Sequence, residues 1–152
     1  MILRKKIDTI LGNTLVVIMT VMVINVLWQV FTRYILGIPS SFTDELARYL
    51  MIWLGILGAA YVSGQNLHVA IDVLPSELSK SAQNKMARMV NLIIIVFAIT
   101  ALIIGGIRLV YITYLLGQHS PALEIPLAVV YLVLPLSGLL IIFYKVSDFL
   151  TK

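Results

Sequence analysis

Four long stretches without a charged residue dominate this chain and restrict what it can fold into. They enclose 24, 23, 19 and 20 residues in a chain of 152. About 20 helical residues cross a hydrocarbon core of roughly 30 Å. Each stretch is therefore long enough for one transmembrane helix, and little of the chain remains for a soluble domain. The charged residues that bound the stretches are Asp8 and Arg33, Arg48 and Asp72, Arg88 and Arg108, and Glu124 and Lys145.

The composition excludes several classes of protein. Hydrophobic residues make up 61% of the chain and charged residues 12%, against roughly 45–50% and 25% in soluble domains. The net charge is +4, but the basic residues are divided among several loops and form no continuous patch, so we expect no nucleic-acid partner. There is no cysteine, which excludes disulfides, thiolate zinc sites and iron–sulfur clusters.

The distribution of lysine and arginine predicts the orientation in the membrane. Eight of these residues fall on the side of the N-terminus and three on the other side, and the positive-inside rule places the basic side in the cytoplasm. The first apolar run continues to Phe31, which is too long for the roughly 7–15 residues of a cleavable signal. We therefore expect a retained first helix and two cytoplasmic termini.

The predicted fold is an all-α integral membrane protein with one domain, residues 1–152. Gly37 and Pro39 should end the first helix, and Pro135 should kink the fourth because it lacks a backbone donor. A short interfacial amphipathic helix, residues 40–48, should precede the second transmembrane helix. The four transmembrane helices are expected at about 10–34, 46–64, 79–116 and 126–149.

The interfacial segment carries charges at helical spacing. The run Ser41 to Asp44 matches a capping box with Asp in place of Glu. Asp44 and Glu45 then fall in the first turn, which favours negative charge, and Arg48 lies four and three residues further on to pair with them. Local capping and ion pairing explain these residues as well as a functional rim does.

A polar stripe crosses the outer half of the first helix. Asn25, Gln29 and Arg33 are four residues apart and share one face. Such a stripe can mark a functional site inside the membrane. The favoured interpretation is hydrogen bonding between helices, with Arg33 reaching the headgroups and pairing with the acidic segment across the loop.

Small residues recur on the second helix. Gly55, Ala59 and Ser63 are spaced four apart, a pattern that lets a neighbouring helix approach closely. We expect this face to contact another helix.

The chain offers little for catalysis or cofactor binding. His68 and Asp72 are four residues apart, but two ligands do not make a metal site, and His119 stands alone in its loop. There is no catalytic grouping and no carboxylate near the middle of a stretch, as a coupled carrier would need. We expect no cofactor, no enzymatic activity and no transport by this chain alone.

Several segments together resemble a known family, the small membrane (Q-type) subunits of tripartite ATP-independent periplasmic (TRAP) transporters. One departure is Phe42, where many members have tryptophan; an interfacial aromatic is kept. The similarity follows the family's order along nearly the whole chain, in residues 29–34, 41–50, 53–55, 68–72 and 120–126, with Tyr131 and Pro135.

The resemblance implies a role. In this family a periplasmic binding protein captures an organic acid, such as a dicarboxylate or sialic acid, and a large membrane subunit carries the acid with sodium ions. The small subunit pairs with the large one, enlarges its scaffold and helps dock the binding protein. The expected partners are thus these two proteins and membrane lipid, with sodium in the large subunit, at the bacterial inner membrane.

A cofactor-free membrane anchor or a small self-assembling channel or carrier remains the alternative function.

Two sets of candidate residues follow from the pattern and the resemblance. The candidates for the partner interface are Asn25, Gln29, Arg33, Asp44, Glu45, Arg48, Gly55, Ala59 and Ser63. The candidates for the periplasmic rim are Asp44, Glu45, Arg48, His119 and Glu124.

Overall fold

The computed structural model describes residues 2–38, 40–65 and 80–151. This part of the chain is helical throughout its regular structure, and four of its helical stretches are long and apolar enough to cross a membrane, which confirms the predicted class. The elements are α1 (Ile2–Tyr34), α2 (Ser41–Gly64), α3 (Lys80–Phe97), the π-helix η3 (Ala98–Gly105), α4 (Gly106–Leu115), α5 (Leu127–Tyr131) and α6 (Val133–Thr151).

The first two transmembrane helices are longer than the sequence predicted. Helix α1 starts at Ile2, not near residue 10, because residues 2–9 contain no glycine or proline and the helix can extend to the basic N-terminus. The predicted interfacial segment, 40–48, forms the first turns of α2 and is continuous with it. No proline lies between Ser41 and Gly64 to separate the two.

The third transmembrane helix is one long unit made of α3, η3 and α4, close to its predicted bounds. Its π-helical part packs tightly on α6. A Cβ placed on Gly138 of α6 would lie 2.8 Å from Cγ1 of Ile103 in η3, and one on Gly106 would lie 2.9 Å from Cβ of Leu134. Glycine at both positions therefore lets the third and fourth transmembrane helices approach closely.

The fourth transmembrane helix is broken, as the sequence predicted. It divides at Leu132 into α5 and α6, because Pro135 has no backbone N–H to continue the ladder. The indole of Trp53 on α2 donates a hydrogen bond to the carbonyl of Val130 at 3.0 Å, next to the break. A side chain from the neighbouring helix thus satisfies one carbonyl where the helix is interrupted.

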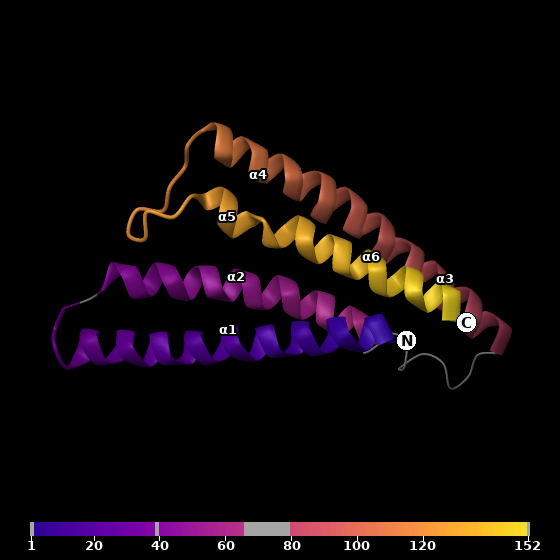
Figure 1. The fold of residues 1–152 in the computed structure, drawn as a ribbon, viewed down its shortest axis with the longest axis horizontal. Helices are drawn as coiled ribbons and strands as arrows, with labels where there is room; N and C mark the ends of the chain where they lie inside the picture. Colours follow the sequence, from indigo (N-terminus) through magenta and orange to yellow (C-terminus); the bar gives the residue numbers. More distant parts are fainter. Residues whose placement is uncertain (1, 39, 66–79, 152) are drawn as a thin grey trace.

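The four transmembrane helices lie in an open row (Figure 1). Helix α1 packs on α2, α2 packs on α6, and α6 packs on η3. The order across the row is first, second, fourth, third. The fourth transmembrane helix is the most enclosed: 39% of its most apolar 18-residue stretch is buried, against 11% in the first and the third. The two outer helices therefore keep broad apolar surfaces.

Along the helix axes, the molecule has two distinct ends. Both termini lie at one end, which we call the terminal end (Figure 1). The other end, the distal end, carries residues 35–38, Ser40 and the loop 116–126. Gly37 (φ 69°) and Gly117 (φ 58°) end α1 and α4 in the left-handed conformation, which glycine adopts without steric cost. Gly37 was predicted to end the first helix; Pro39, predicted with it, lies outside the described residues.

Candidate functional site

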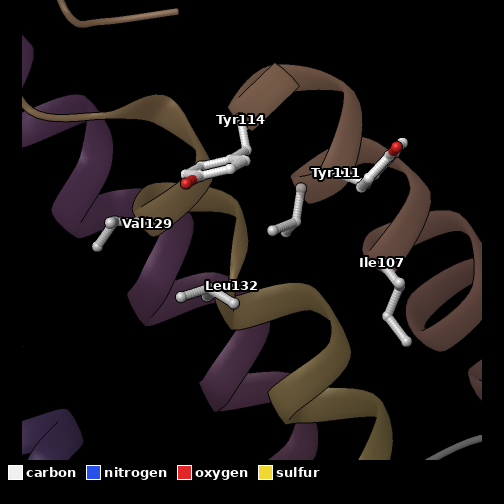
Figure 2. A pocket seen from close by; sticks show the side chains of 7 residues that line it. Ile107, Tyr111, Tyr114, Val129 and Leu132 are labelled. Carbon is white, nitrogen blue, oxygen red and sulfur yellow. The ribbon is translucent and has the colours of Figure 1, made fainter. Parts of the chain in front are cut away.

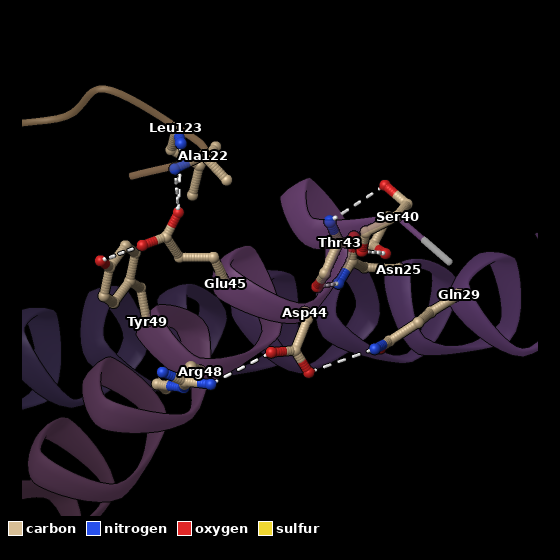
Figure 3. Close-up of polar contacts among 10 residues, drawn as sticks. All are labelled: Asn25, Gln29, Ser40, Thr43, Asp44, Glu45, Arg48, Tyr49, Ala122 and Leu123. Atoms are coloured by element: carbon tan, nitrogen blue, oxygen red, sulfur yellow. Dashed lines mark hydrogen bonds and ion pairs between the residues drawn. The ribbon is translucent and has the colours of Figure 1, made fainter. Parts of the chain in front are cut away.

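The side chain of Glu45 ties the distal loop to α2 (Figure 3). Its Oε2 accepts hydrogen bonds from the backbone N–H groups of Ala122 at 2.8 Å and Leu123 at 3.1 Å. Its Oε1 accepts a bond from the hydroxyl of Tyr49 at 2.8 Å. Glu45 is buried despite its charge, and three donors compensate the lost hydration. The sequence placed Glu45 beside Arg48, but the structure directs it to the loop.

The loop that Glu45 holds is itself ordered by local hydrogen bonds. The N–H of Glu124 donates to the carbonyl of Ser120 at 3.0 Å, and the N–H of Ser120 donates to the carbonyl of Ile125 at 2.9 Å. Ser120 is buried, whereas His119 and Glu124 are exposed. The structure therefore brings three predicted rim residues, Glu45, His119 and Glu124, to one end of the molecule.

The other charged residues of the segment form a local pair. Arg48 contacts Asp44 at 3.1 Å on the exposed side of α2, as predicted. The helix is capped by Ser40, whose Oγ accepts from the N–H of Thr43 at 3.5 Å; the predicted cap, Ser41, is one residue too late. Both serines fit the cap by type, and the extended backbone of Ser40 decides between them.

The polar stripe of α1 makes contacts between helices. The amide of Asn25, which is buried, donates to the carbonyl of Thr43 at 2.7 Å, and the amide of Gln29 donates to Oδ1 of Asp44 at 3.3 Å. Figure 3 shows both bonds joining α1 to α2. The predicted hydrogen bonding between helices is therefore present for these two residues.

Arg33 differs from its two neighbours on the stripe. It is exposed, and within the described residues it makes no ion pair with the acidic segment, contrary to our expectation. Gln29 occupies that position against Asp44 instead. Arg33 lines a polar hollow of about 340 Å³ between α1 and α2, together with Gln29, Ser40, Ser41 and Asp44.

The small residues of α2 divide between two surroundings. Ser63 is buried, and Gly64 lies against Tyr144 of α6: a Cβ on Gly64 would lie 2.7 Å from Cζ of the tyrosine ring. Gly55 and Ala59 are exposed, and no atom lies within 4 Å of a Cβ placed on Gly55. The helices that the structure describes thus leave the Gly55–Ala59 part of the predicted face uncovered.

At the terminal end, a charged cluster that the sequence did not predict connects α1 with α2 and α6. Arg4 on α1 contacts Asp148 on α6 at 2.7 Å and donates to the carbonyl of Gly64. The hydroxyl of Tyr144 donates to Oδ1 of Asp8 at 2.7 Å. The sequence did contain a signal: two polar pairs at four-residue spacing, Arg4 with Asp8 and Tyr144 with Asp148. Only the packing of α6 beside α1 and α2 brings them together.

An apolar groove lies between α4 and α5 (Figure 2). It measures about 420 Å³ and is lined by Ile107, Tyr111 and Tyr114 from α4 with Val129 and Leu132 from the fourth transmembrane helix. Such a lining offers apolar contact and few polar groups for orienting a substrate.

The described residues contain no group of three or more His, Asp or Glu side chains placed to hold a metal ion. His68 and Asp72, which we considered as a pair of ligands, lie outside the described residues.

The contacts described above join helices and loops and leave broad apolar surfaces exposed, an arrangement suited to assembly within a membrane.

Comparisons with known proteins identify the family. Residues 22–152 match the family described as tripartite ATP-independent periplasmic transporters, DctQ component. The chain is 30% identical over 104 residues to the sialic acid TRAP transporter small permease protein SiaQ of Vibrio cholerae, covering 68% of this chain and 60% of that protein. It is 31% identical over 112 residues to the C4-dicarboxylate TRAP transporter small permease protein DctQ of Rhodobacter capsulatus, covering 70% and 47%.

A third relative is much longer. The isethionate TRAP transporter permease protein DctMQ of Oleidesulfovibrio alaskensis is 29% identical over 98 residues, which are 64% of this chain and 15% of that protein. The family match covers most of this chain, and the four apolar transmembrane helices make it a multi-pass protein of the inner membrane. The chain therefore belongs to the DctQ family, the small membrane components of tripartite ATP-independent periplasmic transporters.

Proposed function

We propose that this chain is the non-catalytic scaffold subunit of a sodium-coupled importer of an organic acid. The observation that carries the proposal is the open row of helices. In the first and the third transmembrane helices, only 11% of the most apolar 18-residue stretch is buried. Helices that bury so little of their own surface are suited to packing against another membrane protein. The occupant we propose is the large TRAP membrane subunit, which holds the substrate and the sodium ions.

The relatives support this assignment. The name DctMQ describes a single permease protein of which the region matching this chain is a small part, as expected if small and large components act together. The transported compounds in the relatives' names are sialic acid, C4-dicarboxylates and isethionate, which are all organic anions. An organic acid, either a dicarboxylate or an acidic sugar, is the substrate class we propose for the complex.

The distal end is the part we assign to the periplasm. With both termini cytoplasmic, the loop 116–126 and the Asp44–Arg48 pair lie on the periplasmic side. Glu45 holds the backbone of the loop at two successive N–H groups, so the loop presents His119 and Glu124 on a fixed support. A fixed, polar rim is what docking of a periplasmic binding protein would need.

Purification of the tagged chain tests the proposal. The chain is expressed with its native operon, extracted in mild detergent and analysed by mass spectrometry. A stoichiometric, larger polytopic partner is the expected result. A lone homo-oligomer would overturn the scaffold assignment, and a peripheral enzyme as the sole partner would establish the membrane-anchor alternative.

A further inference from the structure

The polar hollow at the distal end of α1 and α2 combines an arginine and a nearby carboxylate. Arg33 makes no ion pair within the described residues, while Asp44 accepts from Gln29 on one side and pairs with Arg48 on the other. The hollow is about 340 Å³, and two serines, Ser40 and Ser41, complete its lining. It therefore offers donors for an anion beside an acceptor for a cation.

The hollow lies where lipid headgroups are expected. Arg33 is in the last turn of α1, at the end of a transmembrane helix. Trp28 and Phe31 stack on each other with ring centroids 5.7 Å apart, and both are exposed, as is Tyr34. Exposed aromatic residues at the end of a transmembrane helix mark the membrane–water interface. A polar site at this level faces headgroups rather than acyl chains.

The surface changes from polar to apolar toward the bilayer. Val26 lies seven residues before Arg33, about 10 Å along the helix axis on the same side, and is exposed. Met51 lies seven residues after Asp44 on α2 and is also exposed. The order along both helices, charge at the edge and apolar side chains further in, follows the order of groups in a phospholipid.

We propose that this hollow binds a phospholipid of the phosphatidylethanolamine type. The guanidinium of Arg33 donates to the phosphate, helped by the hydroxyl of Ser41, and the carboxylate of Asp44 accepts from the ammonium group. The acyl chains follow Val26 and Met51 into the bilayer. A lipid with only a negative headgroup lacks the group that Asp44 accepts from, so the site prefers the zwitterion.

A lipid titration tests the proposal. The full chain is purified in mild detergent with any membrane partner it retains, stripped of lipid, and titrated with dioleoyl-phosphatidylethanolamine under native mass spectrometry. Arg33→Gln removes the phosphate donor, and we expect affinity to fall about tenfold. The matched control, Arg108→Gln, removes another exposed arginine, on α4, and should stay within about twofold of the wild type. Equal affinities in the two variants would overturn the site.

Two further arms identify the headgroup and its source. Asp44→Asn should lower affinity for phosphatidylethanolamine and leave that for phosphatidylglycerol unchanged; loss of both or of neither would overturn the role of Asp44. Glycerophosphoethanolamine and inorganic phosphate, which lack acyl chains, should not displace the lipid at millimolar concentration. Displacement by either would make this a site for a soluble phosphate and would overturn the lipid assignment. Unchanged thermal unfolding of each variant confirms that it is folded.

Discussion

The carboxylate of Glu45 accepts a hydrogen bond from the backbone N–H of Ala122 at 2.8 Å, across 77 residues of sequence. The same oxygen accepts from Leu123, so one side chain fixes two successive peptide groups of the distal loop. The loop precedes the fourth transmembrane helix, and Glu45 is in the first turns of the second. One charged residue therefore links the distal loop to the start of the second transmembrane helix.

Replacing Glu45 by alanine should release the distal loop. The variant leaves two backbone N–H groups and the Tyr49 hydroxyl without this acceptor, so we expect the midpoint temperature of unfolding in detergent to fall by roughly 5 °C. Uptake by the assembled transporter should fall as well, at equal membrane levels of the chain. Both are measured against the wild type.

The matched control for that change is Asp44→Ala. Asp44 precedes Glu45 on the same helix but is exposed and bonds only side chains, so its loss should leave thermal unfolding nearly unchanged. If the two alanine variants unfold at the same temperature, Glu45 does not hold the loop. Normal uptake by Glu45→Ala with normal membrane levels would instead show that the loop's position is unimportant for transport.

The ion pair of Arg4 and Asp148 should stabilise the terminal end. Arg4→Ala leaves a largely buried carboxylate without its cation, and we expect a loss of about 3 kcal/mol in the free energy of unfolding. The double variant Arg4→Ala/Asp148→Ala should recover part of that loss because no charge is left unpaired. Denaturant titrations of the four proteins in the cycle measure the coupling.

Lys5→Ala serves as the control for this cycle. Lys5 is exposed beside Arg4, so its removal should change the free energy of unfolding by no more than about 0.5 kcal/mol. Additive effects of Arg4→Ala and Asp148→Ala, with no coupling, would contradict the contact.

The close approach of α2 and α6 requires glycine at position 64. A methyl group there would lie 2.7 Å from the Tyr144 ring, and relieving that overlap should cost about 1–3 kcal/mol. Gly58→Ala, on the same helix, meets no atom within 4 Å and should gain up to about 1 kcal/mol from helix propensity. Equal stabilities of the two alanine variants, measured by unfolding in detergent, would rule out the contact.

Much of the fold follows from local features of the sequence. The charge-free stretches predicted the four transmembrane helices, and the missing N–H of Pro135 predicted the break in the fourth. The spacing of Asp44 and Arg48 gave their ion pair. The break and the ion pair depend on residues within one or two helical turns, where backbone geometry alone decides what is adjacent.

The contacts between distant elements could not be predicted in the same way. Spacing placed Glu45 beside Arg48, yet its buried side chain accepts hydrogen bonds from loop donors that only the packing of α2 against the fourth helix supplies. The same packing places Asp148 against Arg4. Helical periodicity tells which residues share a face, and it does not tell which helix covers that face.

The break in the fourth helix should depend on Trp53. Trp53→Phe keeps most of the apolar ring and removes the indole N–H that donates to Val130, so we expect a loss of about 1 kcal/mol. Trp28→Phe is the control, because Trp28 is largely exposed and stacks on Phe31 of its own helix. A larger effect in Trp28→Phe would contradict the importance of the bond at the break, as measured by unfolding in detergent.

The uncovered small residues of α2 should matter only in the complex. Ala59→Leu adds bulk on an exposed face, so the free energy of unfolding of the isolated chain should change by less than about 0.5 kcal/mol. If the large subunit packs on this face, the same bulk separates the two proteins and lowers the amount of partner recovered with the tagged chain. Ala101→Leu makes the same change at an exposed position of η3 and tests the third transmembrane helix in parallel. If recovery falls for Ala59→Leu alone, the partner packs on α2. If recovery falls for Ala101→Leu alone, the interface lies on the third transmembrane helix. Full recovery with both variants shows that neither position faces the large subunit.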